Sequence, residues 1–356
     1  MKVKKSLVFF IPDLTMGGTL SLIKTLIPIL KKHYNISIVV QEIKGQLSLD
    51  VPIYSLNTKN TILSVIKLNS YLKSEKIDII LSFMERANLI SYVACKMTQI
   101  YCVLSIHNSP KYAFCKRTFL KRLMGRLLYK MIDKKTPIIS VSKGISKELK
   151  NDYKLTNIHT IYNLIDCKKY VQNTSTLKTI QLLSYGRFVD QKRMYLLIEV
   201  AKFLKEKKVD FKMTLIGDGL KKDSLLDLVR KYQLTSVVFL LGEDSLSQSQ
   251  KDAHIYMQCS EFEGFGIAML EAMACGLAII AVDCPYGPKE ILLDNCGILI
   301  EDNSDKQIVE DMSLKVVNLI DDSTYLQNLS KKSLERSKDF DIDKISGQYI
   351  DVFEAF

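Results

Sequence analysis

The chain has 356 residues, of which 47% are hydrophobic and 25% charged, and it carries a formal net charge of +11 at pH 7. This composition is normal for a globular protein with a sizeable core, and the length suffices for two ordinary domains. The sequence also predicts no membrane-spanning helix, because no apolar run approaches the roughly 20 residues that cross a bilayer. The short run Leu7–Ile11 is likewise too short for a signal peptide.

The cysteines and the charges add two further constraints. The eight cysteines form no Cys-x-x-Cys pair and no zinc spacing, so we expect buried thiols in a reducing, cytosolic compartment. Residues 1–170 hold 28 Lys and Arg against 10 Asp and Glu, whereas residues 171–356 hold 22 against 29. The first half is therefore expected to favour an anionic partner.

Short apolar runs alternate with helical patterns through the first half. The predicted strands there are Leu7–Ile11, Ile36–Val40, Ile77–Phe83, Tyr101–Ile106 and Pro137–Val141, and Leu20–Lys31 is a predicted helix. Strands that alternate with helices favour a parallel, doubly wound sheet, so we predict an α/β fold.

Two possible ligand-binding features follow predicted strands of this half. Gly17 and Gly18 come after the first strand and could form a phosphate-binding loop, although a plain tight turn explains them equally well and they are not the dinucleotide fingerprint. His107 follows Tyr101–Ile106, at the carboxyl end of a strand, where open α/β sheets bind their ligands. The alternative is an ordinary hydrogen-bonded loop histidine.

The segment Lys111–Lys135 is unusually basic. It holds nine cations against one acid, Asp133, with aliphatic and aromatic residues between them. Basic residues beside an apolar face predict an interfacial helix on anionic lipid. A core helix with a solvated basic face is the alternative. Nucleic acid is a rival partner, but no nucleic-acid module is visible.

The second half repeats the alternation after a polar stretch at residues 172–178, the best linker candidate. Gln181–Tyr185 is a predicted strand and Tyr195–Lys205 a predicted helix. Arg187 and Lys192 lie in the loop between them, at a strand's carboxyl end, where cations can neutralise a diphosphate. A solvated pair of charges is the alternative.

A glycine-containing loop, Ser260–Gly266, leads into a predicted helix that begins at Ile267. Such a loop presents unpaired amides and the positive end of the helix dipole, which attract phosphate. Glu263 lies in the loop and could hold sugar hydroxyls, and Glu271 lies in the helix and could hold a ribose diol. The plainer interpretation is a helix with one exposed glutamate after a mobile acidic loop.

The Glu263–Glu271 pair, with seven residues between the two, resembles the Glu-x7-Glu motif of retaining family-4 glycosyltransferases. The Gly17-Gly18 pair, His107 and the Gly186-Arg187…Lys192 pattern extend the resemblance over nearly the whole chain, in the right order. It implies the GT-B fold, with two Rossmann-like doubly wound parallel-sheet domains that face each other across a cleft. We place the acceptor-side domain at 1–170 and the nucleotide-sugar domain at 171–342, with a helix at about 343–356 that packs back on the first domain.

The resemblance also implies a role for each matching residue. Glu271 corresponds to the ribose-binding glutamate, Glu263 meets the donor sugar, and Arg187 and Lys192 stabilise the departing diphosphate. His107 is grouped with Glu263, Arg187 and Lys192 as a catalytic residue, beside the donor sugar. The remaining donor contacts are assigned to Gly17, Gly18, Gly264, Phe265 and Gly266. Two departures weaken the match: Leu20 stands where the family often has an acid, and Tyr162 and Leu164 alter a Pro-Asn-Gly-Ile-Asp turn.

We therefore predict a retaining hexosyltransferase that uses a UDP-sugar and needs neither a metal nor another cofactor. The Asp283–Leu292 loop resembles that of bacterial enzymes that use UDP-galactose, UDP-GalNAc or UDP-glucose. The expected acceptor is a lipid-linked oligosaccharide of capsule, exopolysaccharide or O-antigen synthesis, at the inner face of the cell membrane. The alternatives are a non-catalytic nucleotide-sugar or polysaccharide binder, a GT-B epimerase and, weakest, a nucleic-acid binder.

Overall fold

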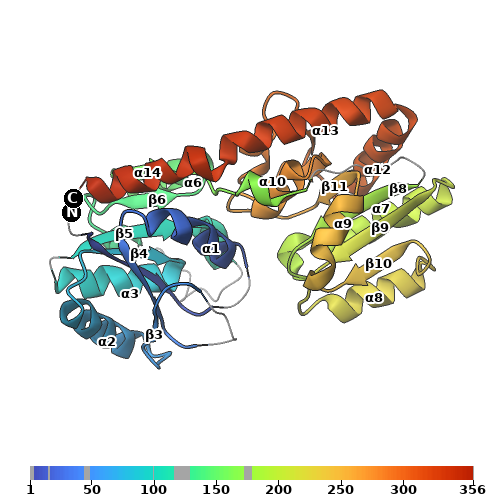
Figure 1. The fold of residues 1–356 in the computed structure, drawn as a ribbon. Helices are drawn as coiled ribbons and strands as arrows, with labels where there is room; N and C mark the ends of the chain where they lie inside the picture. The colour runs from blue at the N-terminus through green and yellow to red at the C-terminus, as the bar shows by residue number, and fades with distance from the viewer. Residues whose placement is uncertain are drawn as a thin grey trace. The chain divides into compact units, whose positions relative to one another are not determined.

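The computed structural model describes residues 4–14, 17–43, 49–98, 100–115, 129–171 and 179–355. The chain forms two compact units, one of Met1–Leu164 with Ile342–Phe356 and the other of Ile165–Asp341 (Figure 1). The division falls before the sequence-based boundary at residue 170. The reason is that Ile165 donates its amide to Phe340 O at 3.0 Å and Cys167 donates its amide to Asp341 at 3.0 Å, which ties this turn to the second unit.

The first unit contains the expected parallel sheet, in the order β3-β2-β1-β4-β5-β6-β7 among the described residues. Its strands are β1 (Ser6–Ile11), β2 (Asn35–Val40), β3 (Ile53–Ser55), β4 (Ile79–Phe83), β5 (Tyr101–Ile106), β6 (Ile138–Ser140) and β7 (Ile158–Thr160). β1 and β4 are almost fully buried, as strands covered by helices on both faces must be. β3 and β7 were not predicted, because they are three-residue edge strands without a buried apolar run.

Helices connect and cover these strands. They are α1 (Gly18–Leu30), α2 (Thr61–Ser74), α3 (Glu85–Lys96), α4 (Pro110–Cys115), α6 (Lys143–Tyr153) and α14 (Ile342–Glu354). The last helix belongs to this unit although it ends the chain. Its Phe353 ring meets Tyr34 edge-on at 5.6 Å, and Tyr34 donates its hydroxyl to Glu354 at 2.8 Å. α14 thus buries its apolar face against the first unit.

The second unit has a parallel sheet in the order β10-β9-β8-β11-β12-β13 within the described part of the chain. Its strands are β8 (Ile180–Tyr185), β9 (Phe211–Ile216), β10 (Val238–Leu241), β11 (Ile255–Gln258), β12 (Ala278–Val282) and β13 (Ile298–Ile300). Its α-helices are α7 (Met194–Glu206), α8 (Lys222–Lys231), α9 (Leu246–Asp252), α10 (Ile267–Ala274), α11 (Pro288–Ile291), α12 (Asp305–Asp321) and α13 (Ser323–Ser337). Short 3₁₀ turns occur at η1 (Cys167–Lys169), η2 (Asp190–Lys192), η3 (Glu243–Ser245) and η4 (Lys338–Phe340). The expected α/β architecture with two doubly wound sheets is confirmed.

The strand order of each sheet reverses once. In the first unit the reversal lies between β1 and β4, and in the second unit between β8 and β11. Loops that leave the carboxyl ends of these strands diverge to opposite faces of the sheet, and the crevice between them is where open α/β sheets bind ligands. The topology therefore predicts where each unit carries its site.

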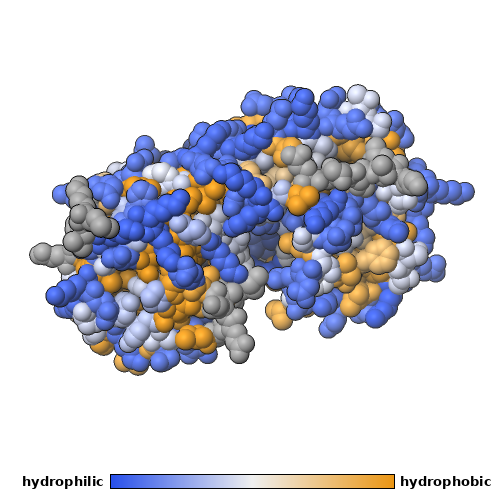
Figure 2. All heavy atoms as spheres, viewed as in Figure 1, coloured by the Kyte–Doolittle hydropathy of each residue, from blue (hydrophilic) through white to orange (hydrophobic). Residues whose placement is uncertain are grey.

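The surface mixes hydrophilic and hydrophobic residues on the face drawn in Figure 2. Within the described ranges, every helix is too short or too polar to cross a bilayer.

Candidate active site

The second unit brings the sequence-predicted residues to its strand-order reversal. Arg187 and Lys192 lie in the loop after β8, and Glu263 and Gly264 lie in the loop after β11. β8 and β11 are hydrogen-bonded neighbours, with Leu182 paired to Ile255. Residues more than seventy positions apart in the sequence therefore share one edge of the sheet.

Lys192 and Glu263 form a close ion pair at this edge. The Lys192 Nζ lies 2.6 Å from Glu263 Oε1, and the two side chains are only 17% and 9% exposed. Ser260 Oγ also donates to Glu263 Oε1, at 2.6 Å. The sequence analysis assigned the two charges to separate parts of a ligand, whereas the structure joins them directly. Glu263 is thus held in one orientation by two donors.

Arg187 differs from Lys192 in having its side chain in solvent. It is exposed, and its guanidinium has no hydrogen-bonded or ion-paired partner among the described residues. Its five donors are therefore free to meet an anion.

The loop that carries Glu263 is pinned to the segment after β12. The Glu263 amide donates to Pro285 O at 2.8 Å, and the Tyr286 amide donates back to Glu263 O at 3.2 Å. At Gly287 the backbones approach so closely that a Cβ would lie 2.1 Å from Phe265 O. Only glycine fits there, and this contact fixes the loop relative to α10.

The start of α10 has the features of an anion site. Gly266, with φ of +115°, precedes the helix and supplies no side-chain cap, and the first turn contains no acidic residue. The first amides of the helix are thus left for a ligand and reinforced by the helix dipole. The Phe265 ring is 1% exposed and packs on Phe340 at 5.4 Å, which leaves only its main chain for a donor.

Glu271 lies inside α10, in a mostly buried position. Burial raises its pKa from the ordinary 4.5 to about 7, although the polar hydroxyls of Tyr170 and Tyr185 act on that pKa in the opposite direction. Tyr185 also donates to Ala268 O at 2.6 Å and accepts from Gln250 at 3.0 Å. With a pKa of about 7, the Glu271 carboxyl is only partly ionised at physiological pH. Its ionised form is a strong hydrogen-bond acceptor for a diol.

In the first unit, Gly17 and Gly18 lie at the strand-order reversal. Gly17 precedes α1, which has no side-chain cap and no acid in its first turn, and no atom of the described residues lies within 4 Å of where a Gly17 Cβ would be. Their position agrees with a loop that a ligand could approach closely.

His107 lies at the end of β5, beside that reversal. It shares a hydrogen bond of 2.8 Å between its Nε2 and Ser105 Oγ, and its ring lies 5.5 Å from that of Phe83. Burial lowers its pKa from 6.5 to about 4. The imidazole is therefore neutral at pH 7, suited to hydrogen bonding rather than to pairing with a diphosphate.

Most of the basic segment Lys111–Lys135 lies outside the described residues, which omit 116–128. Its acid, Asp133, pairs with Lys96 at 3.3 Å. Among the described residues, no group of three or more His, Cys, Asp and Glu is arranged to hold a metal ion.

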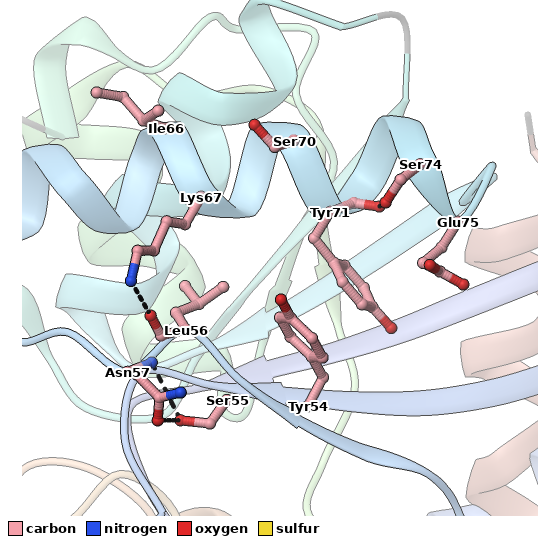
Figure 3. Close-up of a pocket in the computed structure, with 10 residues that line it drawn as sticks. All are labelled: Tyr54, Ser55, Leu56, Asn57, Ile66, Lys67, Ser70, Tyr71, Ser74 and Glu75. Carbon is pink, nitrogen blue, oxygen red and sulfur yellow. Dashed lines mark hydrogen bonds between the residues drawn. The ribbon is translucent and has the colours of Figure 1, made fainter.

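An open groove of about 390 Å³ lies between β3 and α2, and none of these residues lines it. The Tyr54 and Tyr71 rings stack in it at 4.6 Å, and Lys67 Nζ donates to Leu56 O at 2.8 Å (Figure 3).

Sequence reasoning missed three residues of the second-unit site: Ser260, Tyr170 and Arg193. Ser260 lies only three residues before the glutamate that it contacts, but a serine in a loop carries no signal of such a role. Tyr170 acts on Glu271, which is far away in the sequence, so no local pattern marks it. Arg193 adjoins Lys192 but received no role from the sequence, and its side chain is 12% exposed and paired with Asp302.

Comparisons with known proteins connect this arrangement to one class of enzyme. Residues 17–169 match the family model "Glycosyltransferase Family 4", and residues 168–335 match "Glycosyl transferases group 1". A Campylobacter jejuni relative, an N-acetylgalactosamine-N,N'-diacetylbacillosaminyl-diphospho-undecaprenol 4-alpha-N-acetylgalactosaminyltransferase, is 26% identical over 95% of this chain and 96% of its own. An uncharacterized glycosyltransferase of Haemophilus influenzae is 27% identical over 96% and 98%.

Solved structures share the fold at low identity. The crystal structure of Anabaena HepE in complex with UDP-glucose superposes with a TM-score of 0.83 at 16% identity, covering 99% of this chain and 100% of that one. TarM superposes with a TM-score of 0.82 at 16% identity, with 99% of each chain covered.

Proposed function

Since the chain belongs to the family-4 glycosyltransferases of the GT-B fold, we propose that it transfers a hexose or N-acetylhexosamine from a UDP-sugar to a glycan acceptor, with retention at the anomeric carbon. The observation that carries this proposal is the set of groups at the β8–β11 reversal. A cation paired with Glu263, a free guanidinium at Arg187 and an uncapped helix start surround one sheet edge.

Each group has a defined part in the proposed reaction. Arg187, Lys192 and the first amides of α10 stabilise the negative charge that develops on the departing diphosphate, which is electrostatic catalysis. Glu271 accepts hydrogen bonds from the ribose diol, and Glu263 orients the donor sugar. These donors can neutralise the diphosphate by themselves, so we propose that the transfer needs no divalent metal.

First-unit residues complete the proposed assignment. By the family resemblance, Gly17 and Gly18 serve the diphosphate through main-chain contacts and His107 serves the donor sugar. A neutral His107 would do so as a hydrogen-bonding group, because its lowered pKa of about 4 keeps it uncharged at pH 7.

The acceptor is proposed to be a lipid-linked oligosaccharide of bacterial capsule, exopolysaccharide or O-antigen synthesis. The Campylobacter relative acts, by its name, on a diphospho-undecaprenol substrate, and an Erwinia amylovora relative, 25% identical over 57% of this chain, is named for amylovoran biosynthesis. Lys111–Lys135 is the proposed contact with the anionic inner leaflet. No nucleic acid takes part.

A hydrolysis screen tests the proposal. The protein is incubated with UDP-glucose, UDP-galactose, UDP-GalNAc, UDP-GlcNAc and GDP-mannose, each with and without EDTA, and free nucleotide is measured. We expect UDP release from at least one UDP-sugar, undiminished by EDTA, and NMR of the sugar product should show the donor's α configuration first.

Three outcomes would contradict it. UDP binding without release from any donor would favour the non-catalytic binder, and failure to bind any nucleotide would remove the site. Release that EDTA abolishes and magnesium or manganese restores would show that the metal-independent mechanism is wrong.

A further inference from the structure

Arg193 has an unfavourable backbone conformation and a charge that is largely shielded from solvent. It directly follows Lys192 and precedes α7, with φ of +44° and ψ of +39°, in the left-handed region that residues with a side chain seldom adopt. Its side chain is only 12% exposed. Both features are costly unless the side chain makes contacts that compensate for them.

Those contacts reach two other loops of the same sheet edge. Arg193 Nε donates to Cys259 O at 2.6 Å, and its Nη2 donates to Ser260 O at 3.0 Å and to Asp302 Oδ1 at 2.9 Å. Cys259 and Ser260 are the first two residues after β11, and Asp302 follows β13. The planar guanidinium can satisfy these acceptors together, which a lysine ammonium on its flexible stem cannot do with the same geometry.

The neighbouring Gln191 holds the following residues of the loop. The Glu261 amide donates to Gln191 O at 2.8 Å, and Gln191 Nε2 donates to Phe262 O at 2.8 Å. Residues 259–262 are thus held from the β8–α7 loop at consecutive positions, up to the residue before Glu263.

We propose that Arg193 is a positioning residue that sets the Glu263 carboxylate against Lys192, acting through Ser260; this rests on the proposed function. Ser260 is the link, because its carbonyl accepts from Arg193 while its hydroxyl donates to Glu263 at 2.6 Å. Arg193 itself touches no proposed substrate atom. Glu271 does not depend on it, since the hydroxyls that act on the pKa of Glu271 belong to Tyr170 and Tyr185.

The test uses Arg193→Gly and Arg193→Lys in the full chain. Glycine accepts the left-handed conformation, so the first variant removes the guanidinium while the backbone remains favourable. We expect kcat for UDP-sugar hydrolysis to fall about a hundredfold, as for other displacements of a reacting group by roughly an ångström. Calorimetry should give a Kd for free UDP close to the native one, and Arg193→Lys should retain intermediate activity.

Chemical rescue makes the test specific. Millimolar methylguanidinium should restore part of the kcat of Arg193→Gly, because it fits the space that the side chain leaves. The matched control is Arg230→Ala, which removes an arginine that is 69% exposed and paired with Asp227. It should keep native activity and show no response to methylguanidinium.

The proposal is overturned if folded Arg193→Gly keeps native kcat, or if it loses kcat and UDP affinity together without rescue. Should that variant not fold, Arg193→Lys decides in its place: its kcat must fall while UDP affinity is kept. Failure of the proposed function is distinguishable, because the native protein itself would then hydrolyse no donor, whether or not it binds UDP. Amide hydrogen exchange at residues 259–263 gives a separate readout, and it should be faster in Arg193→Gly; unchanged exchange also overturns the proposal.

Discussion

At the scale of single residues, Glu263 and Glu271 show how surroundings separate two identical side chains. Glu263 is ion-paired with Lys192, whereas Glu271 is buried with two tyrosine hydroxyls and has a pKa of about 7. Raised pKa values of this kind are frequent at functional sites. The two carboxylates should therefore respond differently to the same substitution.

Glu271→Gln should weaken binding of free UDP, because a ribose diol needs an ionised acceptor. Glu263→Gln should leave UDP binding nearly intact and lower transfer.

Native UDP affinity should also rise as the pH passes through about 7, where Glu271 ionises, and this dependence should be absent in Glu271→Gln. Calorimetry between pH 5.5 and 8.5 measures both effects. A Glu263→Gln protein that loses UDP affinity while Glu271→Gln keeps it would reverse the assignment.

The same pKa makes a statement about stability. Because the folded-state pKa of Glu271 lies above the ordinary 4.5, its contribution to folding is fully present below 4.5 and is lost as the pH rises through about 7. Urea unfolding at several pH values measures the free energy of unfolding. In Glu271→Gln, that free energy should lack this decrease with rising pH.

Arg187→Ala and Lys192→Ala should each lower kcat by roughly a hundredfold, which is typical for removing one stabiliser of developing charge. Lys192→Ala should have the additional effect of freeing Glu263, its partner at 2.6 Å. Steady-state hydrolysis of the best donor is the measurement, with circular dichroism to show that both variants are folded. Near-native kcat in both would exclude them from the site.

At the scale of elements, close backbone approaches hold the loops of the site together. A Cβ at Gly287 would lie 2.1 Å from Phe265 O, and one at Gly217 would lie 2.0 Å from Gly186 O. The first contact braces the loop before α10, and the second braces the loop after β8. Each of these glycines is needed because the backbone of another loop lies where a side chain would be, and also because of its own positive φ.

Gly287→Ala should destabilise the second unit by a few kcal/mol, since the added methyl must displace backbone and the φ of +93° disfavours a side chain. Gly242→Ala is the matched control, because its φ is −78° and no atom in the described part of the chain lies within 4 Å of the added methyl. Urea denaturation of both variants is the measurement. Equal stability of the two would show that the loop moves aside at no cost.

At the scale of the whole molecule, charge is divided unevenly along the chain. The excess of cations lies in residues 1–170, and nine of those cations are in Lys111–Lys135. Each cation near an anionic bilayer contributes about 1 kcal/mol, and the attraction fades within a Debye length. Several together suffice for reversible membrane binding without a spanning helix.

The protein should therefore bind anionic vesicles in a salt-sensitive way and ignore neutral ones. Replacing Lys116, Arg117, Lys121 and Arg122 with Gln should weaken that binding and leave hydrolysis of the soluble donor unchanged. Vesicle sedimentation at low and high salt measures the first effect. Replacing Lys202, Lys205, Lys207 and Lys208 instead provides a charge-matched control, which should bind as the native protein does.

The sequence by itself determined the alternation of strands and helices, and with it the α/β class. The reason is that buried parallel strands are short apolar runs, which are visible in the sequence without any tertiary information. It also located Glu263, Gly266 and Glu271 on one loop and helix, since they are near neighbours along the chain. Only the tertiary structure decided which loops meet. Lys192 and Glu263 are 71 positions apart, and their contact depends on β8 and β11 being adjacent, which no local pattern encodes. The buried Arg193 and the raised pKa of Glu271 follow for the same reason: both are set by groups that arrive from distant segments when the sheet assembles.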